Sequence, residues 1–178
     1  MRPLVQLSRQ TLESSTDGGS VPMGDVVGHP SLEGLDLGAF VTLRRGDGAL
    51  RGCMGCILPE EPLPETVVQM TRAAALDDPR FAPVSRDEVA DIRISISLVF
   101  PLAPLHDPAL LRIGEHGLYI QNGLRRGVLL PQVPLEQGWD TLEFLSQTCL
   151  KAKLAEDAWR EPETKVACFT TRVIEEEP

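Results

Sequence analysis

Residues 92–100 read Ile-Arg-Ile-Ser-Ile-Ser-Leu-Val-Phe, which is the clearest β-strand pattern in the chain. Large apolar side chains occupy every second position, and successive side chains of a strand point to opposite faces of a sheet. The alternation therefore predicts a strand with one buried face and one polar face. Pro101 and Pro104 follow and end it, because proline cannot donate to a sheet ladder.

Upstream of this strand, the sequence predicts a hairpin and two helices. Residues 37–45 are rich in β-branched and aromatic types, residues 46–48 read Gly-Asp-Gly, and residues 49–57 can return as the second strand. Apolar residues at helical spacing predict helices over residues 3–16 and 65–76.

Downstream, a second hairpin is predicted from residues 117–121 and 128–130, with Asn122-Gly123 as its turn signal. A helix from 141 to 153 and a last strand from 165 to 174 follow. Because hairpins are mixed with helices and strict β-α-β alternation is missing, we expect an α+β fold with a mostly antiparallel sheet and flanking helices.

The length of 178 residues predicts a single domain spanning residues 1–178. Residues 17–31 are rich in Gly, Pro and Ser, so we expect a flexible loop there. Three of the last residues, Glu175 to Glu177, form an acidic run, which we interpret as a solvated tail over 175–178.

The chain is acidic: 17 Lys and Arg against 26 Asp and Glu give a formal charge of −9. This balance disfavours nucleic acid, which requires a clustered basic surface. No apolar run approaches the roughly 20 residues of a membrane span, and the first residues lack a signal-peptide core. We therefore expect a cytoplasmic protein with no membrane partner, whose four cysteines are reduced.

Residues 50–56, Leu-Arg-Gly-Cys-Met-Gly-Cys, carry the strongest signal for chemistry. Cys53 lies between Gly52 and Gly55, where the backbone can approach a ligand closely or adopt positive φ. The positive charge of Arg51 would favour the reactive thiolate. Alternatively, the strand ends in an inert buried cysteine, and the glycines allow close packing. Both interpretations stay open.

Cys53 and Cys56 also form a C-x-x-C pair. A redox pair usually opens a helix in a β-α-β unit, whereas this pair follows a hairpin strand. A structural zinc site normally needs a second paired motif, which leaves only a mixed site with His116. His116 could instead serve as the proton partner of Cys53 if the two meet in space, or it could simply bind local backbone groups.

Three further residues are secondary pocket candidates: Asp78, Gln132 and Trp139. Asp78 lies in a turn that lets Arg80 pair with an acid. Gln132 can bind a ligand or the backbone, and Trp139 can pack in the core or form a flat pocket wall. The chain contains no P-loop, dinucleotide fingerprint, G-x-S-x-G elbow or H-E-x-x-H, which disfavours kinases, elbow-type serine hydrolases and zincins.

Several segments together resemble the AMMECR domain family, in the family's order and from about Leu4 to Ile174. The family is similar to protein A of the AmmeMemoRadiSam system, alongside a Memo-like protein and a radical SAM enzyme. The resemblance implies an α+β fold of two lobes with a cleft between them, near the Leu-Arg-Gly-Cys-x-Gly motif. The family commonly has Thr where this chain has Cys56, so the C-x-x-C pair is not a family feature. The matching segments are residues 38–43, 50–55, 75–84, 94–97, 116–118, 127–133, 136–140 and 149–152.

Together these observations favour a cysteine-dependent enzyme that acts on a small anionic substrate, in a system with a Memo-like protein and a radical SAM enzyme. The alternative is a non-catalytic module of that system that binds a peptide, a metabolite or a partner. We expect no metal and no cofactor. In the enzyme hypothesis Cys53 is the nucleophile, His116 its proton partner and Arg51 the anchor for the anion, with Gly52, Gly55, Asp78, Gln132 and Trp139 lining the substrate site.

Overall fold

The computed structural model describes residues 2–17 and 37–176. The predicted loop lies outside these residues from position 18 onward, as do the last two residues of the predicted tail. The chain forms two compact units, the first from residues 1–99 and 172–178 and the second from residues 100–171. Within the described ranges, no helix has the length and apolar character that crossing a membrane requires.

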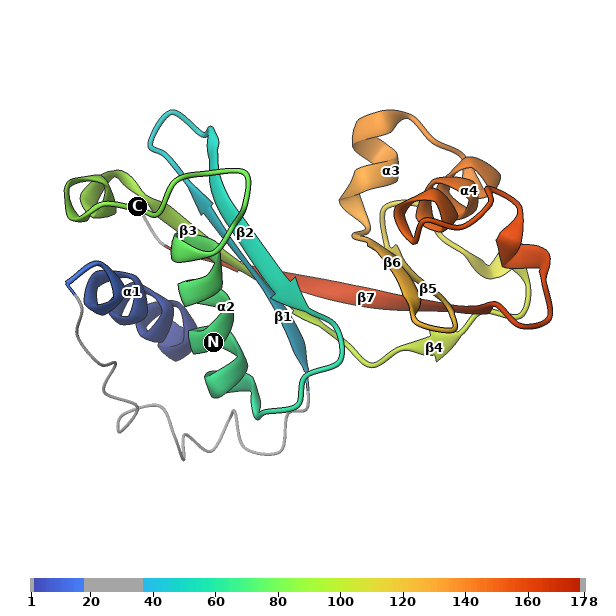
Figure 1. The fold of residues 1–178 in the computed structure, drawn as a ribbon, viewed down its shortest axis with the longest axis horizontal. Helices are drawn as coiled ribbons and strands as arrows, with labels where there is room; N and C mark the ends of the chain where they lie inside the picture. Colours follow the sequence, from blue (N-terminus) through green and yellow to red (C-terminus); the bar gives the residue numbers. More distant parts are fainter. Residues whose placement is uncertain (1, 18–36, 177–178) are drawn as a thin grey trace. The chain divides into compact units, whose positions relative to one another are not determined.

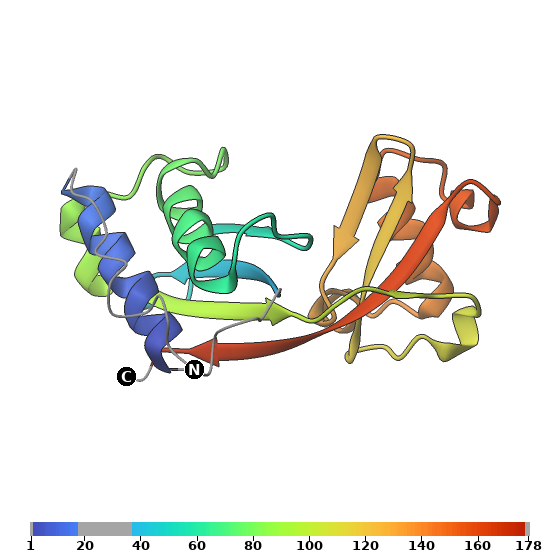
Figure 2. The ribbon, with the colours of Figure 1, turned by 90° about the horizontal axis from the view of Figure 1, so that it is seen from below.

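The first unit is an antiparallel sheet of β1, β2 and β3, joined by the end of β7 (Lys165–Glu175), with two helices on one of its faces. β1 is the central strand and pairs with both β2 and β3. Figures 1 and 2 show both helices on the same side of these strands. The elements in chain order are α1 (Arg2–Thr16), β1 (Gly38–Arg44), β2 (Leu50–Cys56), α2 (Leu63–Leu76), the short 3-10 helix η1 (Arg86–Asp91) and β3 (Arg93–Val99).

The core of the first unit lies between this sheet and the helices. Val41 of β1 and Ile96 of β3 are opposite each other and fully buried, and α1 adds Leu4 and Leu7. The strand that was predicted from the alternation over 92–100 is therefore confirmed. Since alternate side chains point the other way, Thr42 and Ser95 face away from the helices.

An irregularity in β2 changes the direction of Arg51. Leu43 of β1 is opposite Gly52, whereas Arg44 is opposite Leu50, so Arg51 is the extra residue of a β-bulge. A bulge bends its strand locally and can re-aim a side chain. Arg51 is accordingly buried. Arg44, the arginine of the paired strand β1, is exposed.

The second unit combines an antiparallel sheet with short helices. β5 lies between β6 and the long strand β7, and the β5–β6 turn contains Gly123 at φ 57°. Phe144 and Leu145 of α4 pack against Leu118 of β5 in its core. The elements are β4 (Ala103–Pro104), η2 (Pro108–Leu110), β5 (His116–Asn122), β6 (Arg125–Leu129), α3 (Gln132–Gln137), α4 (Thr141–Lys151), η3 (Ala158–Arg160) and β7 (Lys165–Glu175).

Strand β7 contributes residues to both units. Its residues up to Thr171 belong to the second unit, and those from Arg172 belong to the first. In the first unit, Glu176 donates its backbone N–H to Ile94 O (3.0 Å) and accepts a hydrogen bond from Arg9 Nε at Oε1 (2.8 Å). The expectation of a solvated tail is therefore wrong at Glu176, because a helix arginine holds its carboxylate.

Candidate functional site

Cys53 lies on β2 with its thiol on the face that the helices leave uncovered. It is directly opposite Thr42 of β1, which is in turn opposite Ser95 of β3. The Cys53 Sγ and Thr42 Oγ1 atoms are 3.3 Å apart. All three side chains are half-buried. We call these three short polar side chains, which cross the sheet in one line, the polar row.

The backbone of Cys53 is held by Asp78 and Arg80. Its N–H donates to Asp78 Oδ2 (2.8 Å), and Arg80 Nη2 donates to its carbonyl (3.4 Å). Because β2 is an outer strand of the β2-β1-β3 order, these outward backbone groups need partners that do not come from the sheet. We call Asp78 and Arg80 the edge clamp.

The two members of the clamp are also bound to each other. Arg80 Nε donates to Asp78 Oδ1 (2.9 Å) and Arg80 Nη2 donates to Oδ2 (2.7 Å). These bonds hold the pKa of the buried Asp78 carboxyl well below its usual range, despite the opposing effect of burial. The predicted pairing of Arg80 with an acid is confirmed, and Asp78 binds the strand edge with the same carboxylate.

Arg51 was expected to anchor an anion, but it already has a carboxylate partner. Its Nε and Nη2 donate to Glu88 Oε1 (2.7 Å) and Oε2 (2.9 Å), and Nη2 also reaches Pro83 O (3.3 Å). These bonds lower the pKa of Glu88 to about 2. Arg51 is 4% exposed, and its guanidinium lies 6.0 Å from the centre of the Phe81 ring. Glu88 therefore already balances the charge of Arg51, whose buried Nη1 has no hydrogen-bond partner among the described residues.

The glycines that flank Cys53 are explained by packing. A Cβ on Gly52 would lie 2.1 Å from the carbonyl oxygen of Ala74 on α2. A Cβ on Gly55 would lie 2.2 Å from the ring of Phe40 on β1. Neither glycine has positive φ. These contacts favour the second interpretation of the sequence, in which the glycines allow strand, helix and ring to approach closely.

The C-x-x-C pair is neither a disulfide nor a metal site in this structure. All four cysteines are free. Cys53 and Cys56 lie three positions apart on one strand, so their side chains point to opposite faces. Burial raises the pKa of the Cys56 thiol. Across the described parts of the chain, no group of three or more His, Cys, Asp or Glu side chains is placed to hold a metal ion.

The remaining predicted site residues belong to the second unit. His116 begins β5, and its Nδ1 accepts a hydrogen bond from the backbone N–H of Arg112 (3.2 Å). Gln132 is exposed at the start of α3, and Trp139 packs against the apolar core. The meeting of Cys53 with His116 and the cleft between two lobes stay predictions, because each unit is described on its own.

Three residues around this site in the first unit were not predicted: Thr42, Ser95 and Glu88. Thr42 and Ser95 could have been found from the alternation, since both occupy polar positions of predicted strands. Glu88 Oε2 accepts the backbone N–H of Ser85 (3.0 Å) in a local contact at the start of η1. Its second partner, Arg51, lies 37 positions away, and no local pattern indicates that contact.

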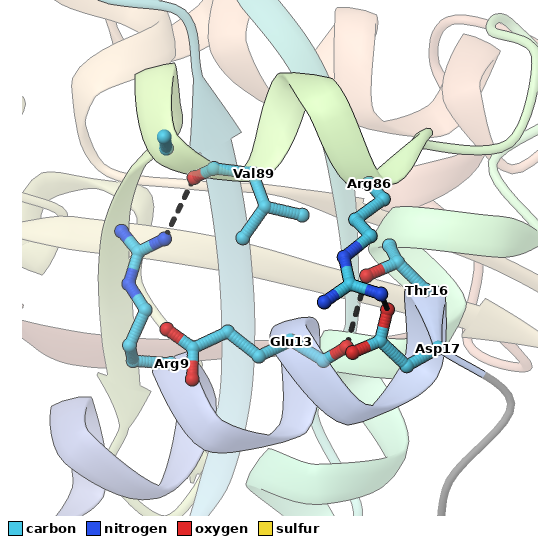
Figure 3. A pocket seen from close by; sticks show the side chains of 7 residues that line it. Arg9, Glu13, Thr16, Asp17, Arg86 and Val89 are labelled. Atoms are coloured by element: carbon cyan, nitrogen blue, oxygen red, sulfur yellow. Dashed lines mark hydrogen bonds and ion pairs between the residues drawn. The ribbon is translucent and has the colours of Figure 1, made fainter.

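A separate cavity of about 490 Å³ lies between α1 and η1 (Figure 3). Its charged residues are largely paired with the protein itself. Arg86 Nη1 is 3.1 Å from Asp17 Oδ1, and Arg9 Nη1 donates to Val89 O (2.9 Å). These contacts join the helix to the η1 segment, and we do not assign the candidate site to this cavity. Its lining residues are Arg9, Glu13, Thr16, Asp17, Arg86, Val89 and Ala90.

The comparison with known proteins gives one consistent result. A family model described as AMMECR1 matches residues 5–174. A protein of Thermococcus gammatolerans is 40% identical over 185 aligned positions, which cover 98% of this chain and 89% of that protein. A protein of Nanoarchaeum equitans is 36% identical, with 98% and 99% covered. The crystal structure of the uncharacterized protein PH0010 from Pyrococcus horikoshii matches with a TM-score of 0.87 at 37% identity, covering 98% of this chain and 90% of that one.

Proposed function

Since the chain belongs to the AMMECR1 family, we propose that it is a non-catalytic binding module whose ligand contacts the polar row of the first unit. The observation that carries this proposal is the arrangement around Cys53. The thiol lies beside a hydroxyl on the sheet face turned away from α1 and α2, while its backbone is fixed by the edge clamp. A short polar surface on a rigid strand suits binding, because little conformational freedom is lost when the ligand arrives.

Around Cys53, the described residues of the first unit place one guanidinium, that of Arg80, but no free base. The described residues of the first unit contain no histidine and no lysine. The carboxylates of Asp78 and Glu88 are both held by arginines. A general base needs a free acceptor within hydrogen-bond reach of the proton that it removes. These residues therefore support binding better than proton transfer.

The ligand that we propose is a small anionic metabolite or a peptide presented to a radical SAM enzyme and a Memo-like protein. The support for these partners is the resemblance of the motif segments to the AmmeMemoRadiSam system. If the three proteins act together, the purified chain should bind the Memo-like protein or the radical SAM enzyme of its own organism. A Cys53→Ser variant should bind equally well, because a binding surface does not need sulfur chemistry.

The alternative is a cysteine-dependent enzyme, and the half-exposed thiol of Cys53 is the observation that favours it. In that case His116 would supply the base. The enzyme hypothesis requires an activated nucleophile, whereas the binding module requires none.

Site-resolved alkylation separates the two functions. The native chain is treated with iodoacetamide near neutral pH, and mass spectrometry follows each cysteine over time. We expect Cys53 to react no faster than a small-molecule thiol, with Cys168, another half-buried cysteine, as the internal control. A rate well above that of the small-molecule thiol, lost in a His116→Gln variant, would overturn the binding proposal and establish the nucleophile.

A further inference from the structure

We infer that Arg44 and Arg93 form a site for a carboxylate or phosphate group on the same sheet face as the polar row. This inference rests on the proposed function and adds the chemical class of the ligand. The anion-binding charge is placed on Arg44 and Arg93, which no sequence motif indicated, because Arg51 is already paired with Glu88.

The strand register brings the two arginines together. Arg44 of β1 and Arg93 of β3 are directly opposite each other. Arg44 lies two positions from Thr42, and Arg93 two positions from Ser95, so strand alternation places all four side chains on one face. Side chains directly opposite in an antiparallel pair have Cβ atoms about 5 Å apart. Both arginines are exposed.

The pair places two positive charges side by side on an acidic chain. Among the described residues, no carboxylate lies within ion-pair distance of either guanidinium. Arg44 Nη1 donates to Gly48 O (3.0 Å), which orients the side chain without neutralising it. Like charges directly opposite on a sheet are unfavourable. An acidic chain of net charge −9 thus keeps two facing cations at one position, and a bound anion would relieve their repulsion.

Two glutamates at and just after the end of β7 lie near this pair. The N–H of Glu176 donates to Ile94 O, which places Glu175 beside β3 close to Ser95. Glu175 is exposed. The carboxylate of Glu176 is bound by Arg9 of α1, on the helix side of the sheet. Arg93 also helps to lower the pKa of Glu176 by charge attraction, whereas the only partner seen for the Arg44 guanidinium among the described residues is Gly48 O.

The arginine pair lies close to the polar row along the same two strands. Two positions along a strand span about 7 Å. A small molecule with an anionic group can therefore bind the guanidinium forks, which match carboxylate and phosphate oxygens in pairs. Its polar end would then reach the hydroxyls of Thr42 and Ser95 beside Cys53.

The test is a titration of the full chain with inorganic phosphate and, separately, with succinate, followed by NMR at constant ionic strength. We expect shifts at Thr42, Arg44, Arg93 and Ser95 with at least one of the two anions. An Arg44→Gln, Arg93→Gln double variant should bind about tenfold more weakly or not at all, as expected when charge-assisted hydrogen bonds are lost. Arg72→Gln, which removes an exposed arginine from α2, is the matched control and should bind normally.

The relative affinities of phosphate and succinate identify the anionic group. If neither anion binds, or if the double variant and Arg72→Gln lose equal affinity, the arginine site is overturned. Unchanged thermal unfolding of the double variant shows that a loss of binding does not come from misfolding.

A second measurement separates this inference from the proposed function. A saturating anion should slow the alkylation of Cys53 in the native chain and leave it unchanged in the double variant. If Cys53 reacts at an ordinary rate and the anion slows that rate equally, or not at all, in the native chain and the double variant, the anion site is wrong and the proposed function is unaffected. If Cys53 reacts much faster than a small-molecule thiol while the anion still binds, the non-catalytic function is ruled out and the anion site remains.

Discussion

The two faces of the β1–β3 sheet differ in almost every respect. The face toward α1 and α2 is formed by fully or nearly fully buried aliphatic side chains such as Val41, Leu43, Ile94 and Ile96. The opposite face has half-buried Thr, Ser and Cys side chains and ends in two exposed arginines. The same three strands thus present one surface typical of a core and one that contributes little to folding.

This difference separates stability from function. Burial of apolar area is the main favourable contribution to folding, so the helix-facing side chains hold the unit together. Exposed polar side chains and facing like charges add little stability or reduce it. The uncovered face is therefore the part of the sheet that sequence changes can alter without unfolding the protein, and a binding role would explain its composition.

The largest expected effect is on the helix-facing side. Ile96→Ala should lower the free energy of unfolding by about 3–4 kcal/mol, because it leaves a cavity at a fully buried position. Ser95→Ala, the adjacent residue on the opposite face, should change it by less than about 0.5 kcal/mol. Urea unfolding of both variants checks the contrast. Equal losses would mean that the two faces are not energetically distinct.

The next effect concerns the buried charge of Arg51. Glu88→Gln should cost about 3 kcal/mol, since it leaves a guanidinium that is 4% exposed without its carboxylate. Glu60→Gln, at an exposed position, is the matched control and should be near neutral. Urea unfolding near neutral pH gives both values. A neutral Glu88→Gln would show that Arg51 finds another partner.

The edge clamp should have a smaller and more local effect. Asp78→Asn removes the charge that binds Arg80 and should cost about 2 kcal/mol. It should also speed hydrogen exchange at the Cys53 amide, which donates to Asp78. The Val41 amide, inside the sheet, serves as the reference. If both amides accelerate equally, the change reports global destabilisation, and the clamp has no special role at Cys53.

Acid should weaken the same two ion pairs. The pKa values of Asp78 and Glu88 are lowered in the folded chain, so their stabilisation is complete above the usual carboxyl range and is lost as pH falls through it. The free energy of unfolding should be flat from pH 7 to about 5 and should drop by about 1 kcal/mol near pH 4. The Glu88→Gln variant should show a shallower decline. An identical slope in that variant would contradict the assignment.

The smallest effect should have the opposite sign. Arg44→Gln removes one of two facing like charges and should raise the free energy of unfolding by about 0.2–0.5 kcal/mol. Arg72→Gln on α2 should leave it unchanged. Thermal and urea unfolding at low salt can resolve the difference. A loss of stability in Arg44→Gln would mean that the hydrogen bond to Gly48 O outweighs the repulsion.

Much of the fold could be predicted because it depends on periodic patterns. The three predicted helices and the strands were confirmed to within a few residues, as with the helix predicted over 65–76 and observed as Leu63–Leu76. Helix α3 was missed because Pro131 and Pro134 interrupt a six-residue segment that is too short to show a helical period.

The site was harder to predict because its contacts are not local. Cys53 meets Asp78 across 25 positions, and Arg51 meets Glu88 across 37. Both contacts depend on the path of the loop after α2 and on the bulge at Arg51, neither of which follows from hydrophobic periodicity. A lone arginine beside a cysteine looks like an activating charge, but the carboxylate of Glu88, which binds this arginine, changes that interpretation.

The division of β7 between the units bears on the order in which the chain folds during translation. Domains usually fold as they leave the ribosome, with the N-terminal one first. Here the first unit includes Arg172–Glu176, which are made after the whole of the second unit. Residues 1–99 therefore cannot complete the first unit until Arg172–Glu176 have been synthesised. The second unit can finish folding before that point. During synthesis, the Ile94 edge of β3 is exposed to the risk of pairing with another nascent chain.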